Sequence, residues 1–310
     1  MSQSTNTILM IRPVGFRKNE QTAVNNYFQE NLELQNAEIN AKAQEEFDTF
    51  VNKLRAVGVN VIVESDNPDT DTPDSIFPNN WVSFHQNGNI AIYPMFAENR
   101  RQERREDIFV RLEEEGLKIS AIVDYTQAEE DEVFLEGTGS MVLDREHRKA
   151  YCALSPRADE GLFIEFCEDF EYSPIVFKAY QTIENKRMPI YHTNVMMCIA
   201  DDFAVICLDC IDDKKERKSV MKQLKADSKE IIAITEAQMH QFAGNMLQVK
   251  GDKDKKYLIM SEAARNSLTQ QQVDKIEKYC TIVSSSLETI ETCGGGSARC
   301  MMAEVFLPRA

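Results

Sequence analysis

The sequence has few positive charges and no long apolar run, which argues against several common classes of protein. Its 310 residues carry 35 Lys and Arg against 51 Asp and Glu, a net charge of −16. A nucleic-acid surface needs clustered Lys and Arg, so we expect no nucleic-acid partner. No stretch approaches the roughly 20 apolar residues of a membrane span. The opening MSQSTNTILMIRP also lacks the basic region of a signal peptide. We therefore expect a cytoplasmic protein with no membrane partner.

The cysteines and glycines complete no metal or phosphate motif. The eight cysteines are scattered and mostly sit in apolar runs, which is typical of reduced thiols. Cys207 to Cys210 (CLDC) has the spacing of a metal knuckle, but no second pair or neighbouring His completes a tetrahedral site. The segment GGGSARC, ending at Cys300, lacks the Lys-Ser/Thr ending of a phosphate loop. We expect neither a metal nor a cofactor.

One order of elements recurs along the chain: a hairpin, a charged amphipathic helix and a further strand. The first hairpin turns on Asn87-Gly88, a strong hairpin signal. Three more follow, turning near 145–148, at Asp201-Asp202 and on Gly251. The expected helices cover about Arg100 to Gly116, Asp159 to Phe170, about Asp213 to Ala226, and a stretch ending near Lys278. No low-complexity segment or long linker interrupts the pattern, so we expect a single domain over 1–310.

A fifth unit can be assembled across the two ends of the chain. The strand MMAEVFLP near the C-terminus would pair with TILMIRPV near the N-terminus, followed by a helix over 36–57 and the strand VNVIVES. Units of about 50 to 60 residues indicate a radial or solenoidal repeat, and closure removes exposed sheet edges. The sequence therefore predicts an α/β fold, a five-bladed propeller of ββαβ-type repeats with pseudo-fivefold symmetry. An ordinary α+β domain with hairpins is the alternative.

Equivalent units would bring the residues just before each hairpin to a common axis. A nucleophilic site needs a thiol, a proton carrier and an orienting group, and this set supplies all three. The side chains at these positions are Asn80, Glu136, His192, Asn194, Asn245 and Cys300.

Each of these residues also has a purely structural interpretation. Cys300 can be a small buried apolar residue, and Cys293, before the three glycines, competes for the role of nucleophile. His192 can be a hydrogen-bonded core histidine. The carboxamides can stabilise turns through their own side chains. Glu136, flanked by Leu135, would need a partner if it is buried.

Five motifs, in order, carry a resemblance to a known family: MIRPVGFRKNEQTAVNNYFQ, FPNNW, EGTGSM, HTNVMM and GGGSARCMMAEVFLP. The chain resembles the guanidino-group-modifying superfamily with the five-bladed α/β propeller (pentein) fold, which holds arginine deiminases, dimethylarginine dimethylaminohydrolases and amidinotransferases. It looks most like the bacterial amidinotransferase-like proteins described as citrulline-utilisation hydrolases. The likeness spans nearly all of the chain.

The resemblance implies roles for the catalytic residues. The thiolate nucleophile of the family falls on Cys300, its general acid/base on His192 and the carboxylate partner on Glu136. The position of the first guanidinium-binding aspartate falls on Asn80.

The resemblance also implies how the amino-acid end of a substrate is bound. Asp74 matches a position that binds the α-amino group. Arg157, in ALSPRAD, resembles the site for the α-carboxylate. Arg100 or Arg101 resembles a second such arginine, and the sequence does not separate the two.

Two carboxamides depart from the pattern of the arginine deiminases, which have Asp at the positions of Asn80 and Asn194. Carboxylates match a guanidinium, which is cationic and carries only donors. A ureido group is neutral and has a carbonyl oxygen that needs a donor, and Asn offers both a donor and an acceptor. The two substitutions therefore favour a ureido substrate.

We expect a hydrolase that converts citrulline to ornithine, ammonia and carbon dioxide through an S-carbamoyl intermediate on Cys300. The same residues would serve arginine deimination, dimethylarginine hydrolysis or amidino transfer, and a non-catalytic amino-acid-binding module is a further alternative. The acidic surface suits a monomer or a homodimer.

Overall fold

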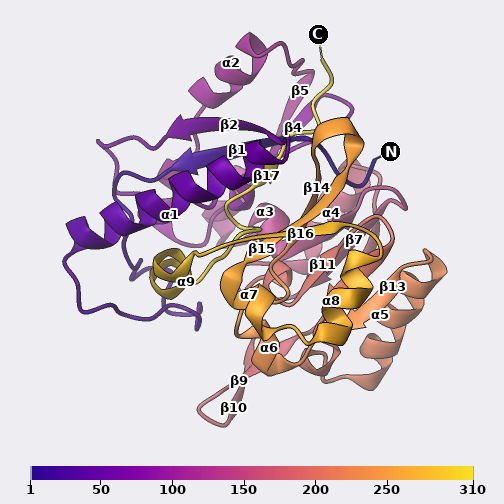
Figure 1. Ribbon diagram of the computed structural model, residues 1–310. Coiled ribbons are helices and arrows are strands. Elements are labelled where there is room, and N and C mark those ends of the chain that lie inside the picture. The colour runs from indigo at the N-terminus through magenta and orange to yellow at the C-terminus, as the bar shows by residue number, and fades with distance from the viewer. Residues whose placement is uncertain (1, 310) are drawn as a thin grey trace.

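The recurring order of elements is present in the computed structural model, which describes residues 2–309. Within that range, five three-stranded sheets share one connectivity. The first two strands of each are antiparallel, and the third runs parallel to the middle strand. A parallel neighbour requires a crossover connection, and a helical segment provides it in each unit. The fold is thus mixed α/β (Figure 1).

One sheet joins the two ends of the chain, as expected. Its strands are β17 (Ala303–Glu304), β1 (Thr7–Arg12) and β2 (Asn60–Ser65), and helix α1 (Asn36–Ala56) connects the last two. Ile8 pairs with Glu304 in the antiparallel ladder. Figure 1 accordingly shows the N- and C-termini on the same side of the molecule.

The other four sheets follow the same order. The first strand of each sheet, which is β17 in the sheet above, is called the innermost strand. Their strands are β3 (Val82–Phe84), β4 (Asn89–Ile92) and β5 (Ala121–Asp124); β6 (Met141–Asp144), β7 (Lys149–Ala153) and β8 (Ser173–Phe177); β11 (Met197–Ile199), β12 (Phe203–Ile206) and β13 (Glu230–Ala233); and β14 (Leu247–Lys250), β15 (Lys256–Ser261) and β16 (Thr281–Ser285). Their crossovers are η2 (Glu98–Glu103) with α2 (Asp107–Glu114), α4 (Glu160–Asp169), α5 (Lys214–Ala226), and α7 (Glu262–Ser267) with α8 (Gln270–Glu277).

Two of the expected helices are wrong in extent, because each is broken. The helix expected over about 100–116 is interrupted at Arg104, whose backbone is extended. The side chain of Arg104 is bound there by Glu129 and the carbonyl of Tyr93. The helix ending near Lys278 is interrupted at Leu268, which is buried and extended, and Thr269 then caps α8. In both places tertiary contacts outweigh helical periodicity.

Several shorter elements were not expected from the sequence. A hairpin of β9 (Tyr180–Ile183) and β10 (Lys186–Pro189) turns on two residues with positive φ, Glu184 and Asn185. The others are η3 (Thr126–Asp131), η5 (Leu208–Cys210), α6 (Glu236–Met239), η6 (Asp252–Asp254) and α9 (Glu288–Gly294).

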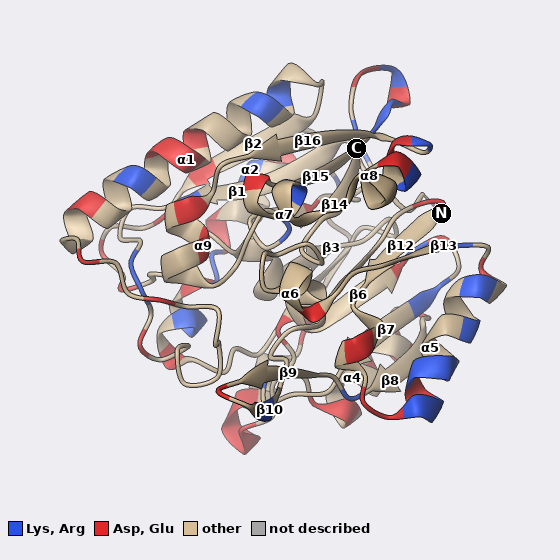
Figure 2. Ribbon diagram, turned by 60° about the horizontal axis from the view of Figure 1, so that its bottom comes forward, with Lys and Arg blue, Asp and Glu red and all other residues tan. Residues whose placement is uncertain are grey.

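Innermost strands of different sheets meet in the interior. β3 contacts β17, while β11 contacts both β6 and β14. The apolar core fills the space between these strands and the outer helices. In Figure 2, charged residues (blue and red) are frequent on α1, α5 and the loops, whereas β3 and β6 consist mostly of uncharged residues (tan). The ends of the innermost strands are therefore where polar side chains from different units can come together.

No helix in residues 2–309 is long and apolar enough to cross a membrane.

Candidate active site

Three short helical turns bring the candidate residues together. They are η1 (Pro78–Asn80), α3 (Gly137–Ser140) and η4 (Thr193–Val195), each directly before an innermost strand. The turn α3 contacts both of the others. At Gly139 an added Cβ would lie 2.3 Å from Nδ2 of Asn80 and 2.9 Å from Nδ1 of His192. Only a glycine leaves room there for both side chains.

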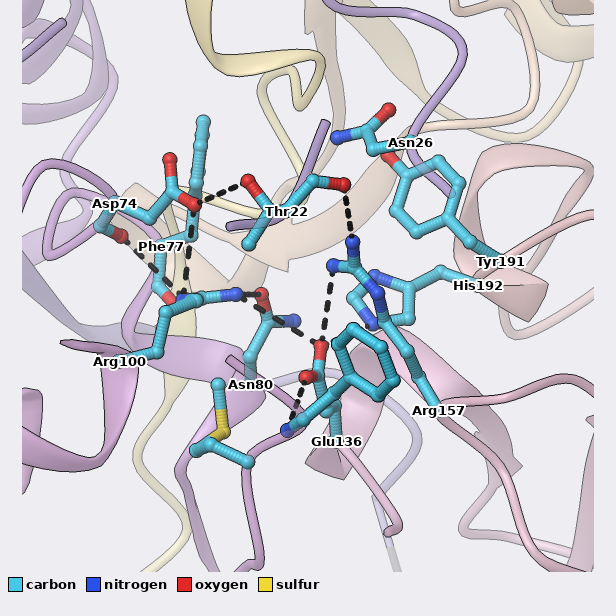
Figure 3. A network of polar contacts seen from close by, with 12 residues as sticks. Thr22, Asn26, Asp74, Phe77, Asn80, Arg100, Glu136, Arg157, Tyr191 and His192 are labelled. Atoms are coloured by element: carbon cyan, nitrogen blue, oxygen red, sulfur yellow. Dashed lines mark hydrogen bonds and ion pairs between the residues drawn. The ribbon is translucent and has the colours of Figure 1, made fainter. Parts of the chain in front are cut away.

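Glu136 lies at the centre of a buried polar network (Figure 3). Its Oε2 is 2.7 Å from Nε2 of His192, and its Oε1 accepts the backbone N–H of Phe96 at 3.0 Å. Nη1 of Arg157 and Nη1 of Arg100 lie 3.5 Å and 3.8 Å from Oε2. The two arginines point toward the carboxylate from opposite sides. These contacts supply the cations and hydrogen-bond donors that a buried carboxylate requires.

The network sets the protonation of its members. Burial by itself would raise the pKa of Glu136, but Arg157, the hydrogen bond from His192 and Arg100 together hold that pKa well below its usual range. Burial lowers the pKa of His192 to about 4, with Glu136 only partly offsetting it. At neutral pH a carboxylate therefore accepts from a neutral imidazole. The ring proton is then assigned to Nε2, and Nδ1 is the basic nitrogen.

Cys300 lies beside the turn that carries His192. Its sulfur is 3.4 Å from Nδ2 of Asn194 and 3.3 Å from Nδ2 of Asn245. Cys293, the competing thiol, lies on α9 in the same apolar cluster as Cys300, and burial raises the pKa of Cys293. The thiol, the imidazole and the carboxylate are at most 2% exposed, so the site is closed to solvent.

Asn80 is oriented by a buried ion pair. Its Oδ1 accepts from Nη1 of Arg100 at 2.8 Å, while Nε and Nη2 of Arg100 bind the two carboxylate oxygens of Glu103 at 2.8 and 2.9 Å. Burial raises the pKa of Glu103, and the contact with Arg100 opposes that rise. Glu103 was not among the residues singled out from the sequence. Its i,i+3 spacing from Arg100 was the one available signal.

The segment between β1 and α1 covers the site and contributes residues that sequence reasoning missed. Asn19 and Thr22 donate to Oδ2 of Asp74 at 2.8 and 3.0 Å. Arg157 donates from Nε to Oδ1 of Asn25 at 2.9 Å and from Nη2 to the carbonyl of Thr22 at 2.9 Å. A signal was present in NEQTAVNNYFQ, which is rich in carboxamides.

Arg100 and Arg101, which the sequence did not separate, have different environments. The side chain of Arg100 is 2% exposed, within the network. That of Arg101 is 29% exposed, donates to the carbonyl of Met95 and pairs with Glu129. Of the two, the structure brings Arg100 to the candidate site, although its donors are already bound by protein acceptors.

Comparisons with known proteins identify the family of the chain. The sequence profile of the family described as "N,N dimethylarginine dimethylhydrolase, eukaryotic" matches residues 12–307. The chain belongs to this family. It is therefore a member of the guanidino-group-modifying pentein superfamily, whose dimethylarginine dimethylaminohydrolases are hydrolases acting on C–N bonds. A comparison with curated protein sequences finds no match.

Solved structures of the superfamily share the fold. ArgZ, an arginine dihydrolase from the ornithine–ammonia cycle in cyanobacteria, superposes with a TM-score of 0.74 at 17% identity, over 98% of this chain and 41% of that chain. The chain thus spans about two fifths of full-length ArgZ, and it covers 99% of the product-bound N-terminal domain of ArgZ (TM-score 0.71, 16% identity, 97% of this chain). A dimethylarginine dimethylaminohydrolase adduct with S-methyl-L-thiocitrulline gives a TM-score of 0.63 at 14% identity, over 96% of this chain and 98% of that chain.

Replacing the two neighbouring arginines separately should have very different effects on stability. In Arg100→Ala, the buried Glu103 loses both hydrogen bonds, so the free energy of unfolding should fall by about 3 to 5 kcal/mol. Arg101→Ala removes the same atoms from a partly exposed pair and should cost about 1 kcal/mol or less. Urea unfolding at pH 7 measures both. Equal losses would contradict the assignment of Arg100 to the buried network.

The lowered pKa of His192 predicts a pH-dependent stability. An unfolded His titrates near 6.5, so between pH 4 and 6.5 the unfolded chain binds a proton that folded His192 does not. The free energy of unfolding should therefore rise with pH through this window. In His192→Gln, whose amide can still donate to Glu136, the rise between pH 4.5 and 7 should shrink by about 2 kcal/mol. Urea unfolding at the two pH values tests this, and an unchanged rise would refute it.

Proposed function

We propose that this protein is a cysteine-dependent hydrolase that cleaves a ureido C–N bond and converts citrulline to ornithine, ammonia and carbon dioxide. The observation that carries the proposal is the charge around the candidate nucleophile. The sulfur of Cys300 meets carboxamides, and the carboxylate beside His192, that of Glu136, is already shared with two arginines.

This charge arrangement favours a neutral over a cationic substrate. A guanidinium bound against Glu136 would meet the positive charges of Arg100 and Arg157 within 4 Å of the same oxygen. Unit charges a few ångströms apart in a buried site interact strongly. A ureido group carries no charge, and its N–H groups can donate to Glu136. Its carbonyl oxygen, which becomes an oxyanion under attack, can accept from the amide of Asn194.

The amino-acid end of the substrate would be read by Asp74 and Arg157. Burial raises the pKa of Asp74, and Arg100 with the bonds from Asn19 and Thr22 opposes that rise. Its Oδ1 is buried and has no hydrogen-bond donor among the described residues, as a site for an ammonium group requires. Arg157, which now donates to neutral oxygens of the covering segment, would bind the α-carboxylate as a stronger acceptor. Arg100 would act by holding Asn80 in place.

The reaction would proceed in two displacements at one carbon. Neutral His192 takes the thiol proton as the sulfur of Cys300 bonds to the ureido carbon, and it returns that proton to the departing nitrogen of ornithine. The S-carbamoyl group left on Cys300 is attacked by water, with His192 as the base. The C–S bond then breaks, and the carbamate released decomposes to ammonia and carbon dioxide. Glu136 keeps the imidazole oriented throughout.

A guanidine is the alternative substrate. The name of ArgZ, arginine dihydrolase, supports this possibility, since ArgZ shares the fold. Arginine deimination, dimethylarginine hydrolysis and amidino transfer would use the same thiol and imidazole. A non-catalytic amino-acid-binding module would bind such ligands without turnover.

We further propose that the chain forms one domain, in which the five units close into a five-bladed propeller in the cytoplasm. The shared connectivity of the five sheets, the contacts between innermost strands and the joining of the two ends in one sheet support closure. Closure places the residues before each innermost strand around one axis.

A substrate panel tests the main proposal. Purified protein incubated with citrulline should release ornithine and ammonia in equal amounts, with much slower release from arginine, dimethylarginine or agmatine. Cys300→Ala should abolish turnover, whereas Cys293→Ala should not. Turnover of arginine with none of citrulline would overturn the choice of a neutral substrate, and activity in Cys300→Ala would overturn the covalent mechanism.

Restoring the two negative charges should shift the preference toward cations. In the variant with Asn80→Asp and Asn194→Asp, the ratio of kcat/KM for arginine to that for citrulline should rise about tenfold or more, because carboxylates attract a guanidinium. Asn79→Asp adds a charge at the neighbouring position, whose amide faces Thr138, and serves as the matched control. An unchanged ratio in the double variant, or an equal rise in the control, would refute the charge argument.

A further inference from the structure

Asn245 lies beside the candidate nucleophile but has no role in the site described so far. It follows α6 and directly precedes Met246 and the innermost strand β14, and its side chain is fully buried. The preceding Gly244 packs against the turn that carries Asn194, since an added Cβ there would lie 2.4 Å from the carbonyl oxygen of Val195. Because position 244 has no side chain, the segment can approach closely enough for Asn245 to reach the sulfur of Cys300.

The backbone fixes which way the Asn245 carboxamide faces. Its Oδ1 accepts the N–H of Arg299 at 3.0 Å, and its Nδ2 donates to the carbonyl of Asn194 at 3.0 Å. In the opposite orientation, Nδ2 would face the N–H of Arg299, donor against donor, and Oδ1 would face the carbonyl of Asn194, acceptor against acceptor. Nδ2 must therefore face the sulfur of Cys300, 3.3 Å away.

We infer that Asn245 is a further catalytic residue, which donates a hydrogen bond to the sulfur of Cys300 and stabilises it as a thiolate. A thiol sulfur is a weak acceptor, whereas a hydrogen bond to an ionised acceptor is considerably stronger. The donor therefore favours the charged form of the sulfur. This inference rests on the proposed function in one respect, that Cys300 is the nucleophile.

The two carboxamides at the sulfur differ in their freedom. Asn194 also places its Oδ1 within 3.9 Å of the sulfur, and its amide is the group proposed to turn toward the substrate. Asn245 is bound to the backbone at both ends of its amide, so its N–H stays on the sulfur whatever is bound. That donor is present when the sulfur attacks. It is present again when the C–S bond of the S-carbamoyl group breaks and the sulfur takes back the electron pair.

Alkylation of Cys300 tests this without any substrate. Iodoacetamide reacts with the thiolate, and peptide mass spectrometry separates Cys300 from the other cysteines. In the full-length protein the rate at Cys300 is followed from pH 5 to pH 10 for the natural chain, Asn245→Ala and Asn245→Asp. At pH 7 both variants should react about tenfold more slowly, with the pH midpoint of alkylation about one unit higher and the high-pH plateau unchanged.

Asn26→Ala is the matched control. Asn26 is another buried carboxamide, and it donates to the carbonyls of Gly294 and Gly295 in the same loop without touching the sulfur. Its loss can change access to Cys300, which alters the plateau, but should leave the midpoint in place. An unmoved midpoint in folded Asn245→Ala, or an equal shift in Asn26→Ala, overturns the inference. If neither Asn245 variant folds while Asn26→Ala does, the residue is structural and the inference is withdrawn.

The alkylation result stays separate from the outcome for the proposed function. A shifted midpoint in a protein that turns over neither citrulline nor arginine supports Asn245 as the sulfur donor and refutes the activity. Turnover of citrulline with an unshifted midpoint supports the proposed activity and refutes Asn245 as the sulfur donor.

Discussion

The buried carboxylate of Glu136 is the constraint on which the rest of the site depends. A negative charge with no exposure to water must be compensated by nearby cations and donors. The chain meets this need with the imidazole of His192 and the guanidinium of Arg100, which come from two other units of the fold, and with the guanidinium of Arg157 from the same unit. The ends of the corresponding sheets are therefore held together by one charge. The same contacts keep that carboxylate ionised, whereas burial keeps the imidazole neutral although Glu136 favours its protonation.

The compensation of Glu136 also shapes what the site can bind. Two positive charges close to the only carboxylate that touches His192, within the described residues, leave little attraction for a cationic group. Asn80 then does not add a second anion, and its amide oxygen instead accepts from Arg100. The presence of Asn rather than Asp is thus consistent with the charges around it. Site charge thus links the stability of the fold to the ureido substrate that we propose.

The closed state of the site follows from polar contacts that a ligand can replace. Asn19 and Thr22 occupy one oxygen of Asp74, and Asn25 occupies the guanidinium of Arg157. These are hydrogen bonds between protein groups of the kind that an ammonium and a carboxylate form more strongly. In the proposed function, an ammonium group would bind the free oxygen of Asp74, and a carboxylate would replace the contact between Arg157 and the segment. The covering segment is therefore as much a part of the candidate site as the residues proposed to be catalytic.

The sequence by itself determined the features that depend on neighbours along the chain. The turn at Asn87-Gly88 and the start of α5 after Asp213 are local, because turn geometry and helix capping involve only adjacent residues. The ordered motifs also identified the family before any coordinates. Tertiary structure alone decided that the helix breaks at Arg104 and that Arg100, not its neighbour Arg101, enters the network. Those outcomes depend on contacts with residues distant in sequence, and burial of charge, unlike periodicity, is defined only once the units have packed.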